Sequence, residues 1–194
     1  MREPPPALPL AAAIHRHLPE GGLARGALHE IQMADRQAGV ALAELILGRL
    51  HAPVLWIAPG GEQPWPPGLQ RLGLAADREL LAEFRQPADG LWLLEEALRA
   101  PALGGAALRL DRLDRIASRR LQLAAKGSSR IGLLLRDGAE AGPCSAVSRW
   151  HVASLPDAEL RPRWRLTLLR CRGGQPGAWV VRASDGALWV EEPA

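Results

Sequence analysis

The stretch that decides the fold class is LHEIQMADRQAGVALAELIL, residues 28–47. Its first five residues predict a β-strand. A very apolar helix is expected from about residue 40 to residue 50, after a short connection that contains glycine. In many nucleotide-binding proteins such a strand–loop–helix carries Gly-x-x-x-x-Gly-Lys-Ser/Thr, whose backbone amides surround phosphate while the lysine neutralises it. The stretch therefore predicts the scaffold of a phosphate-binding loop.

The chemistry of that loop is missing from residues 33–40. When the loop is aligned on the preceding strand, the lysine position falls on Gly39 and the position of the magnesium-binding hydroxyl falls on Val40. Asp35 would also set a carboxylate where phosphate should lie. We therefore expect no nucleotide hydrolysis, no bound cofactor and no catalytic residue at this place.

Apolar strands and helices continue to alternate beyond this stretch. Strands are predicted at 28–32, 54–58, 80–84, 106–110 and 131–136, and helices at 40–50, 68–73, 89–99 and 114–126. Such alternation is typical of an α/β fold, in which helices cover both faces of a largely parallel sheet. Asp111 ends one of these strands, where nucleotide-binding enzymes of this class place a carboxylate that holds metal-bound water. The alternative is a structural aspartate that caps the next turn.

The pattern changes after residue 136. Further strands are predicted at 146–153, 163–171, 178–182 and 188–190, with Asp185-Gly186 as a two-residue hairpin turn. These strands should extend the parallel sheet with antiparallel neighbours from about residue 146. Because no linker is evident, we expect a single domain over residues 10–194. A flexible tail, residues 1–9, should precede it, since its four prolines prevent regular helix.

Three arginines in the last third of the chain are candidate contact residues. Arg163 and Arg165 alternate with the apolar side chains of strand 163–171, and Arg172 opens the following RGGQPG turn. Guanidinium groups can fork onto carboxylates or phosphates, so these residues predict a contact surface for a partner protein or for DNA. A merely solvated strand face is the alternative.

The composition sets wider limits. A content of 47% hydrophobic and 23% charged residues indicates a globular chain. Lys126 is the only lysine among 24 basic residues, and the sequence pI of about 9.6 permits contact with nucleic acid or an acidic partner without requiring it. Cys144 and Cys171 are expected to be free thiols.

No segment approaches the ~20 apolar residues of a membrane span, and the histidine spacing predicts no metal site. We expect a cytoplasmic location.

Several segments together carry a resemblance to a known family. They are LPEGGLARGALHEI (18–31), PADGLWLLEEALR (87–99), ASRRLQLAA (117–125) with IGLLLR (131–136), and PRWRLTLLRCRGGQPGAWVV (162–181). In these segments the chain resembles the ImuA family, RecA-like proteins of bacterial damage-induced mutagenesis. The resemblance covers nearly the whole chain after the N-terminal tail.

This resemblance implies a RecA-like core without ATPase chemistry, acting as a non-catalytic adaptor in SOS-induced error-prone translesion DNA synthesis. It implies an ImuB-type polymerase-like partner, with RecA and an error-prone replicative-type polymerase subunit as further partners and with DNA contacted indirectly. Two alternatives remain open. Family members have also been labelled SulA-like cell-division inhibitors, and the arginines permit a direct DNA-binding module.

Overall fold

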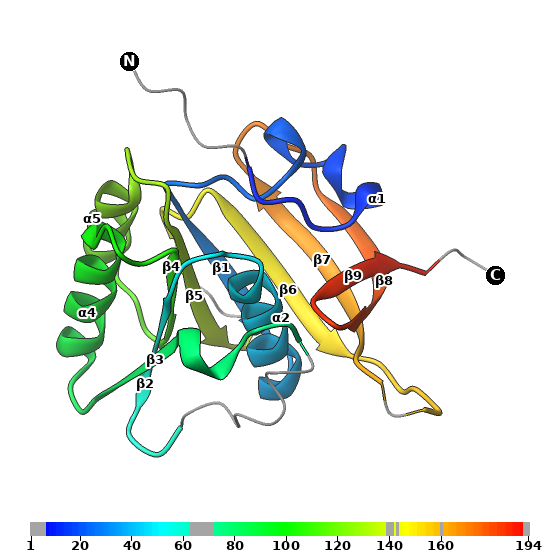
Figure 1. Cartoon of the computed structure of the whole chain (residues 1–194). Helices are drawn as coiled ribbons and strands as arrows, with labels where there is room; N and C mark the ends of the chain where they lie inside the picture. Colours follow the sequence, from blue (N-terminus) through cyan, green and yellow to red (C-terminus); the bar gives the residue numbers. More distant parts are fainter. Residues whose placement is uncertain (1–6, 63–71, 139–141, 143, 160, 192–194) are drawn as a thin grey trace.

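The computed structural model describes residues 7–62, 72–138, 142, 144–159 and 161–191 (Figure 1). Within these residues one nine-stranded sheet has the order β3-β2-β4-β5-β1-β6-β7-β8-β9. The strands are β1 Ala27–Met33, β2 Val54–Pro59, β3 Glu79–Phe84, β4 Gly105–Arg109, β5 Ile131–Asp137, β6 Ser148–Ser154, β7 Arg163–Cys171, β8 Gly177–Ser184 and β9 Ala187–Val190. Strands β1–β6 pair in parallel and β7–β9 are antiparallel. The predicted α/β class with antiparallel C-terminal strands is confirmed.

Strand β6 corrects one boundary of that prediction. It pairs with β1 in parallel, with Arg149 opposite Glu30, so the antiparallel part begins at Arg163 rather than near residue 146. Buried and half-buried residues alternate along most of β6. A strand with one open face shows this alternation whichever way its neighbour runs, so the sequence pattern could not reveal the direction.

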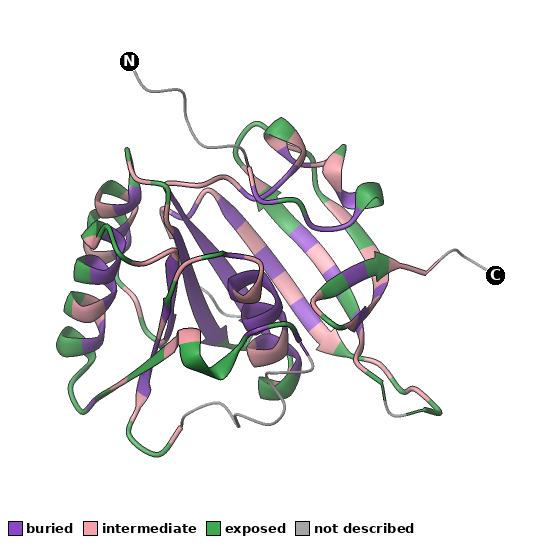
Figure 2. Ribbon diagram, in the orientation of Figure 1, coloured by how far each residue is buried: buried purple, intermediate pink, exposed green. Residues whose placement is uncertain are grey.

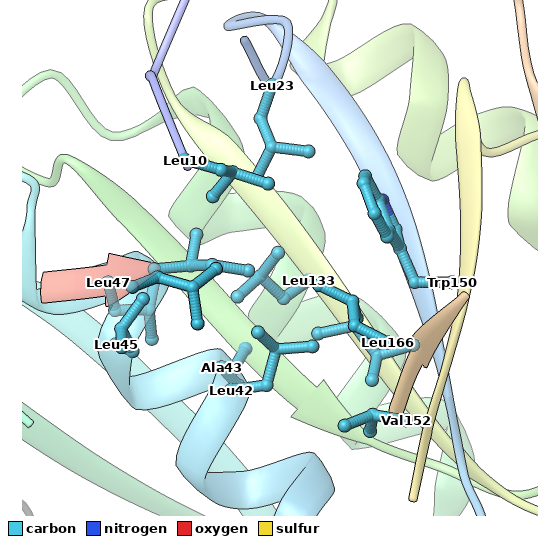
Figure 3. Close-up of a cluster of buried hydrophobic side chains, with 14 of the residues drawn as sticks. Leu10, Leu23, Leu42, Ala43, Leu45, Leu47, Leu133, Trp150, Val152 and Leu166 are labelled. Atoms are coloured by element: carbon cyan, nitrogen blue, oxygen red, sulfur yellow. The ribbon is translucent and has the colours of Figure 1, made fainter. Parts of the chain in front are cut away.

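The helices lie on the two faces of the sheet. Helix α2, Arg36–Gly48, packs on one face against β1, β4, β5 and β6 (Figure 1). Helices α4, Pro87–Arg99, and α5, Arg115–Ala125, pack on the other face against β1–β5. Under α2, Leu42, Leu45 and Leu47 meet Leu133, Val152 and Leu166 in the larger apolar cluster (Figure 3). Full burial of each such leucine side chain stabilises the folded state by about 1.5–3 kcal/mol.

The chain ahead of β1 belongs to this core. Leu8 is buried and pairs its backbone with that of Leu23 through two hydrogen bonds of 2.8 Å. Leu10 and Ile14 are also buried, the latter in the short helix α1, Ala12–His15. The expected flexible tail over residues 1–9 is therefore wrong at Leu8. Burial of its apolar side chain stabilises this position although prolines lie before and after it. Residues 1–6 lie outside the described part.

Helix and turn limits follow local signals. Pro87 occupies the first turn of α4, and Gly127, at φ +80°, follows the C-cap of α5. Short 3₁₀ turns lie at Pro19–Gly21 and Ala76–Arg78. Asp185 and Gly186 both have positive φ between β8 and β9, which confirms the predicted two-residue hairpin. Four of the six residues of the helix expected at 68–73 lie outside the described ranges.

Candidate functional site

The connection between β1 and α2 contains only Ala34 and Asp35. Asp35 is the N-cap of the helix, and its Oδ1 accepts a hydrogen bond of 2.9 Å from the amide of Ala38. Ser154, at the end of β6, donates its amide to Oδ2 at 2.7 Å and its hydroxyl to Oδ1 at 2.9 Å. Although partial burial acts to raise it, these hydrogen bonds hold the pKa of Asp35 below its usual value. An internal carboxylate thus occupies the anion-binding end of α2.

The other two positions of the expected loop lie inside the helix. The structure begins α2 at Arg36 rather than at Val40, so Gly39 and Val40 belong to its first turns. Gly39 is buried, and a Cβ there would lie 2.1 Å from Cγ of Met33. This glycine lets the helix approach the strand closely, whereas a phosphate loop would use it to turn the chain. The expected eight-residue loop is wrong because the cap at Asp35 starts the helix early.

Asp111 lies two residues beyond the end of β4 and is exposed. Its backbone oxygen accepts two hydrogen bonds from Arg136, at 3.1 and 2.9 Å, and its Oδ1 accepts one of 3.4 Å from the amide of Asp137. These contacts tie the ends of β4 and β5 together. Strand β5 lies between β4 and β1, so Asp111 and Asp35 follow strands that are roughly 10 Å apart. The structure does not bring them together.

The predicted contact arginines also lie apart. Arg163 and Arg172 are at opposite ends of β7, a nine-residue strand that spans roughly 30 Å. Arg163 forms a two-pronged ion pair with Glu191, at 2.9 and 2.8 Å, which with Arg182 lowers the pKa of Glu191 to about 2. The guanidinium group of Arg163 is therefore already paired within the chain. Arg165 is exposed and has no ion pair with any described residue.

Arg165 lies on a half of the sheet that α4 and α5 leave open. These two helices pack mainly on β1–β5. Along most of β6 and β7 buried residues alternate with half-buried or exposed ones, so one face of these two strands is open (Figure 2). The opposite face of β7 is core, since Trp164, Leu166 and Leu168 are buried as predicted. A sheet face that none of the described helices covers is thus available to a partner beside α5.

A buried ion cluster lies beneath the edge of that face, and sequence reasoning missed it. Glu30, in the middle of β1, is fully buried and accepts hydrogen bonds from Arg136 at 3.1 Å and from Arg149 at 2.8 Å. The available signal was an acidic residue inside an apolar strand. A buried carboxylate in such a place requires partners, and the sequence did not say from which strands they would come.

A second buried polar chain links β1 to β6 on the opposite face. Nε2 of His29 lies 2.9 Å from the backbone oxygen of Ala24, and Nδ1 lies 2.6 Å from Oγ of Ser148. Burial lowers the pKa of His29 to about 4, so the ring is neutral at pH 7. A neutral ring satisfies both contacts if Nε2 donates to the carbonyl and Nδ1 accepts from the hydroxyl. No group of three or more potential metal ligands is found among the described residues.

Comparison with known proteins identifies the family. No family model matches the chain. The chain is 35% identical to Protein ImuA of Caulobacter vibrioides, strain NA1000, over an alignment that covers 95% of this chain and 86% of that protein. Protein ImuA of a second strain of the same species gives the same values. The described helices include none that is long and apolar enough to span a membrane. The chain belongs to the ImuA family.

Proposed function

We propose that this protein is a non-catalytic, RecA-like adaptor in damage-induced error-prone translesion DNA synthesis, and that it binds an ImuB-type polymerase-like protein. Family membership supports the process and the partner. One observation supports the absence of catalysis above all others: at the N-terminus of α2, where a nucleotide enzyme presents free amides to phosphate, the carboxylate of Asp35 already accepts a hydrogen bond from the amide of Ala38. RecA and an error-prone replicative-type polymerase subunit are further proposed partners.

The proposed lack of nucleotide chemistry has a direct test. Titration of ATP with magnesium into the protein, followed by calorimetry, should give no binding heat, because a phosphate would have to displace Asp35 and would meet no lysine at Gly39. Micromolar binding of ATP would contradict this part of the proposal. Asp35→Ala serves as the matched variant. It removes the competing carboxylate yet supplies no cation, so it too should show no tight binding.

The partner contact is expected on the open face of β7. Replacing Arg165 by glutamate should weaken retention of the ImuB-type partner at least about tenfold in a pull-down, since loss of one partner from a hydrogen-bonded charge pair buried in an interface typically costs about 2–5 kcal/mol. Arg165 has no ion pair among the described residues, so the melting temperature should change little. Arg85→Glu, a charge reversal at another exposed arginine, is the control.

Separate baits decide between the partners. RecA and the polymerase subunit are tested in parallel with the ImuB-type protein, and the tubulin-like division protein is added for the cell-division alternative. Retention by the division protein alone would replace the adaptor proposal with that alternative. Equal retention of the Arg165→Glu and Arg85→Glu variants by the ImuB-type bait would exclude this face of β7 from the contact.

A further inference from the structure

We propose that a pocket lined by Arg115, Cys144, Ser145, Arg149 and Arg170 binds a carboxylate from an acidic segment of a partner protein. This pocket, here called the arginine pocket, has a volume of about 350 Å³. It lies where the first residue of α5 meets β6 and β7, at the edge of the open sheet face. The inference deepens the proposed adaptor function and rests on it for the identity of the partner.

The walls of the pocket are fixed by the fold. Arg149 and Arg170 are direct neighbours across the β6–β7 pair, so their side chains leave the same face. Arg149 donates Nε to Glu30 at 2.8 Å and Nη2 to the backbone oxygen of Gly142 at 2.9 Å. Arg170 donates Nη2 to the backbone oxygens of Cys144, at 3.2 Å, and Ala146, at 2.8 Å. Both guanidinium groups are therefore held in place before any ligand arrives.

The held arginines keep free hydrogen-bond donors. Nη1 of Arg149 has no hydrogen bond to a described residue, and the same is true of Nη1 and Nε of Arg170. Ser145 adds a hydroxyl, which lies 3.3 Å from that of Ser118. A planar acceptor such as a carboxylate can accept two parallel hydrogen bonds from one guanidinium group.

The charge around the pocket is unbalanced. Glu30 is shared between Arg136 and Arg149, so one carboxylate serves two guanidinium groups. Arg115 and Arg170 form no ion pair with any residue in the described ranges. Burial raises the pKa of the Cys144 thiol, which therefore adds no negative charge at neutral pH. The described residues thus leave an excess of positive charge that an anion would neutralise.

The surroundings favour a peptide over a nucleic acid. Proteins that bind single-stranded nucleic acid combine cationic grooves with aromatic side chains on which bases stack, and none of the described residues that line this pocket is aromatic. Two exposed aliphatic residues are sequence neighbours of the lining arginines: Ile116, next to Arg115, is 82% exposed, and Leu169, next to Arg170, is 43% exposed. An acidic residue with apolar neighbours in a partner segment would match the charged centre and these two aliphatic residues.

The test uses the full chain and a synthetic peptide of Asp-Asp-Leu repeats labelled for fluorescence anisotropy. The peptide should bind, and the amide signals of Ser145, Arg149 and Arg170 should shift in ¹⁵N spectra. A peptide with asparagine in place of aspartate should not bind. Arg115→Glu should weaken binding about tenfold, while the exposed Arg85→Glu should leave it almost unchanged. Arg115 occupies the first position of α5, where an acidic residue suits the helix dipole, so this variant should fold.

Three results would overturn the inference. One is binding of oligothymidylate with these amide shifts while the acidic peptide gives none, which would mark a nucleic-acid site. Another is an equal effect of Arg85→Glu and Arg115→Glu, which would indicate diffuse attraction. The third is the absence of any shift at the pocket. Failure of the adaptor function is distinguishable, because the peptide would then still bind while no bait retains the protein.

Discussion

Replacement of Glu44 by glutamine is expected to stabilise the protein by roughly 3 kcal/mol at pH 7. Glu44 is fully buried in α2, and neither carboxyl oxygen has a hydrogen-bond partner among the described residues. Burial, reinforced by the nearby Glu79, raises the pKa of Glu44 from 4.5 to about 9. The folded protein therefore keeps this carboxyl protonated at neutral pH, while the unfolded chain releases the proton.

The sign of the effect follows from that difference. The contribution of Glu44 to stability is fully present below pH 4.5 and declines as the pH rises towards about 9, because only the unfolded state ionises in this window. At about 1.4 kcal/mol per pH unit, the loss between the unfolded pKa and pH 7 is roughly 3 kcal/mol. Glutamine resembles the neutral acid in shape and does not ionise, so Glu44→Gln removes the decline.

Urea denaturation at about pH 4 and at pH 7 provides the measurement. The gain from Glu44→Gln should be close to zero at the lower pH and appear at the higher one. Glu96→Gln, at an exposed position of α4, is the control and should show no comparable pH dependence. A gain of the same size at both pH values would mean that packing, not protonation, distinguishes the two side chains.

Replacement of Glu30 by glutamine should have a large effect of the opposite sign. It leaves the buried Arg136 and the half-buried Arg149 without their shared carboxylate. Removing one partner from a buried ion pair typically destabilises a protein by 3–5 kcal/mol, because the remaining charge is left uncompensated away from water. We expect a loss in that range, measured as a shift of the urea midpoint with unchanged slope.

A double variant isolates the reason for that loss. Glu30→Leu combined with Arg136→Leu removes the buried charge together with its partner, and should be less destabilised than Glu30→Gln alone. Arg149 is 19% exposed, so its charge can remain near water in this variant. If the single and double variants lost equal stability, the uncompensated charge would not be the cause. A loss below about 1 kcal/mol for Glu30→Gln would show that water reaches the cluster.

The parts of the fold that depend on short-range patterns could be predicted. The alternation in strand 163–171 located the buried face of β7, and Asp185-Gly186 located its neighbouring hairpin. The start of α2 was missed although its signal was local: Asp35 before an apolar run is also an N-cap signal, and the motif-based alignment counted it as loop.

The remaining errors have a long-range origin. Arg163 looked free because its partner, Glu191, is 28 residues away. The arginine pocket could not be predicted, since its lining residues come from α5, the segment before β6, β6 itself and the far end of β7. Spacing along the chain does not show which distant residues will come into contact unless the strand order is already known. The parallel pairing of β6 with β1 could not be predicted either.

The strand order also has a consequence for how the chain folds. Strand β1 is completed on its two sides by β5 and β6, and Glu30 meets Arg136 and Arg149 across sequence separations of 106 and 119 residues. During synthesis β1 emerges early, but one of its edges waits for β5, which ends at Asp137, and the other waits for β6, which ends at Ser154. Pairings of such high contact order close slowly and leave apolar strand edges exposed in the meantime. The centre of the sheet therefore closes late, and until then it is open to wrong association in a nascent chain.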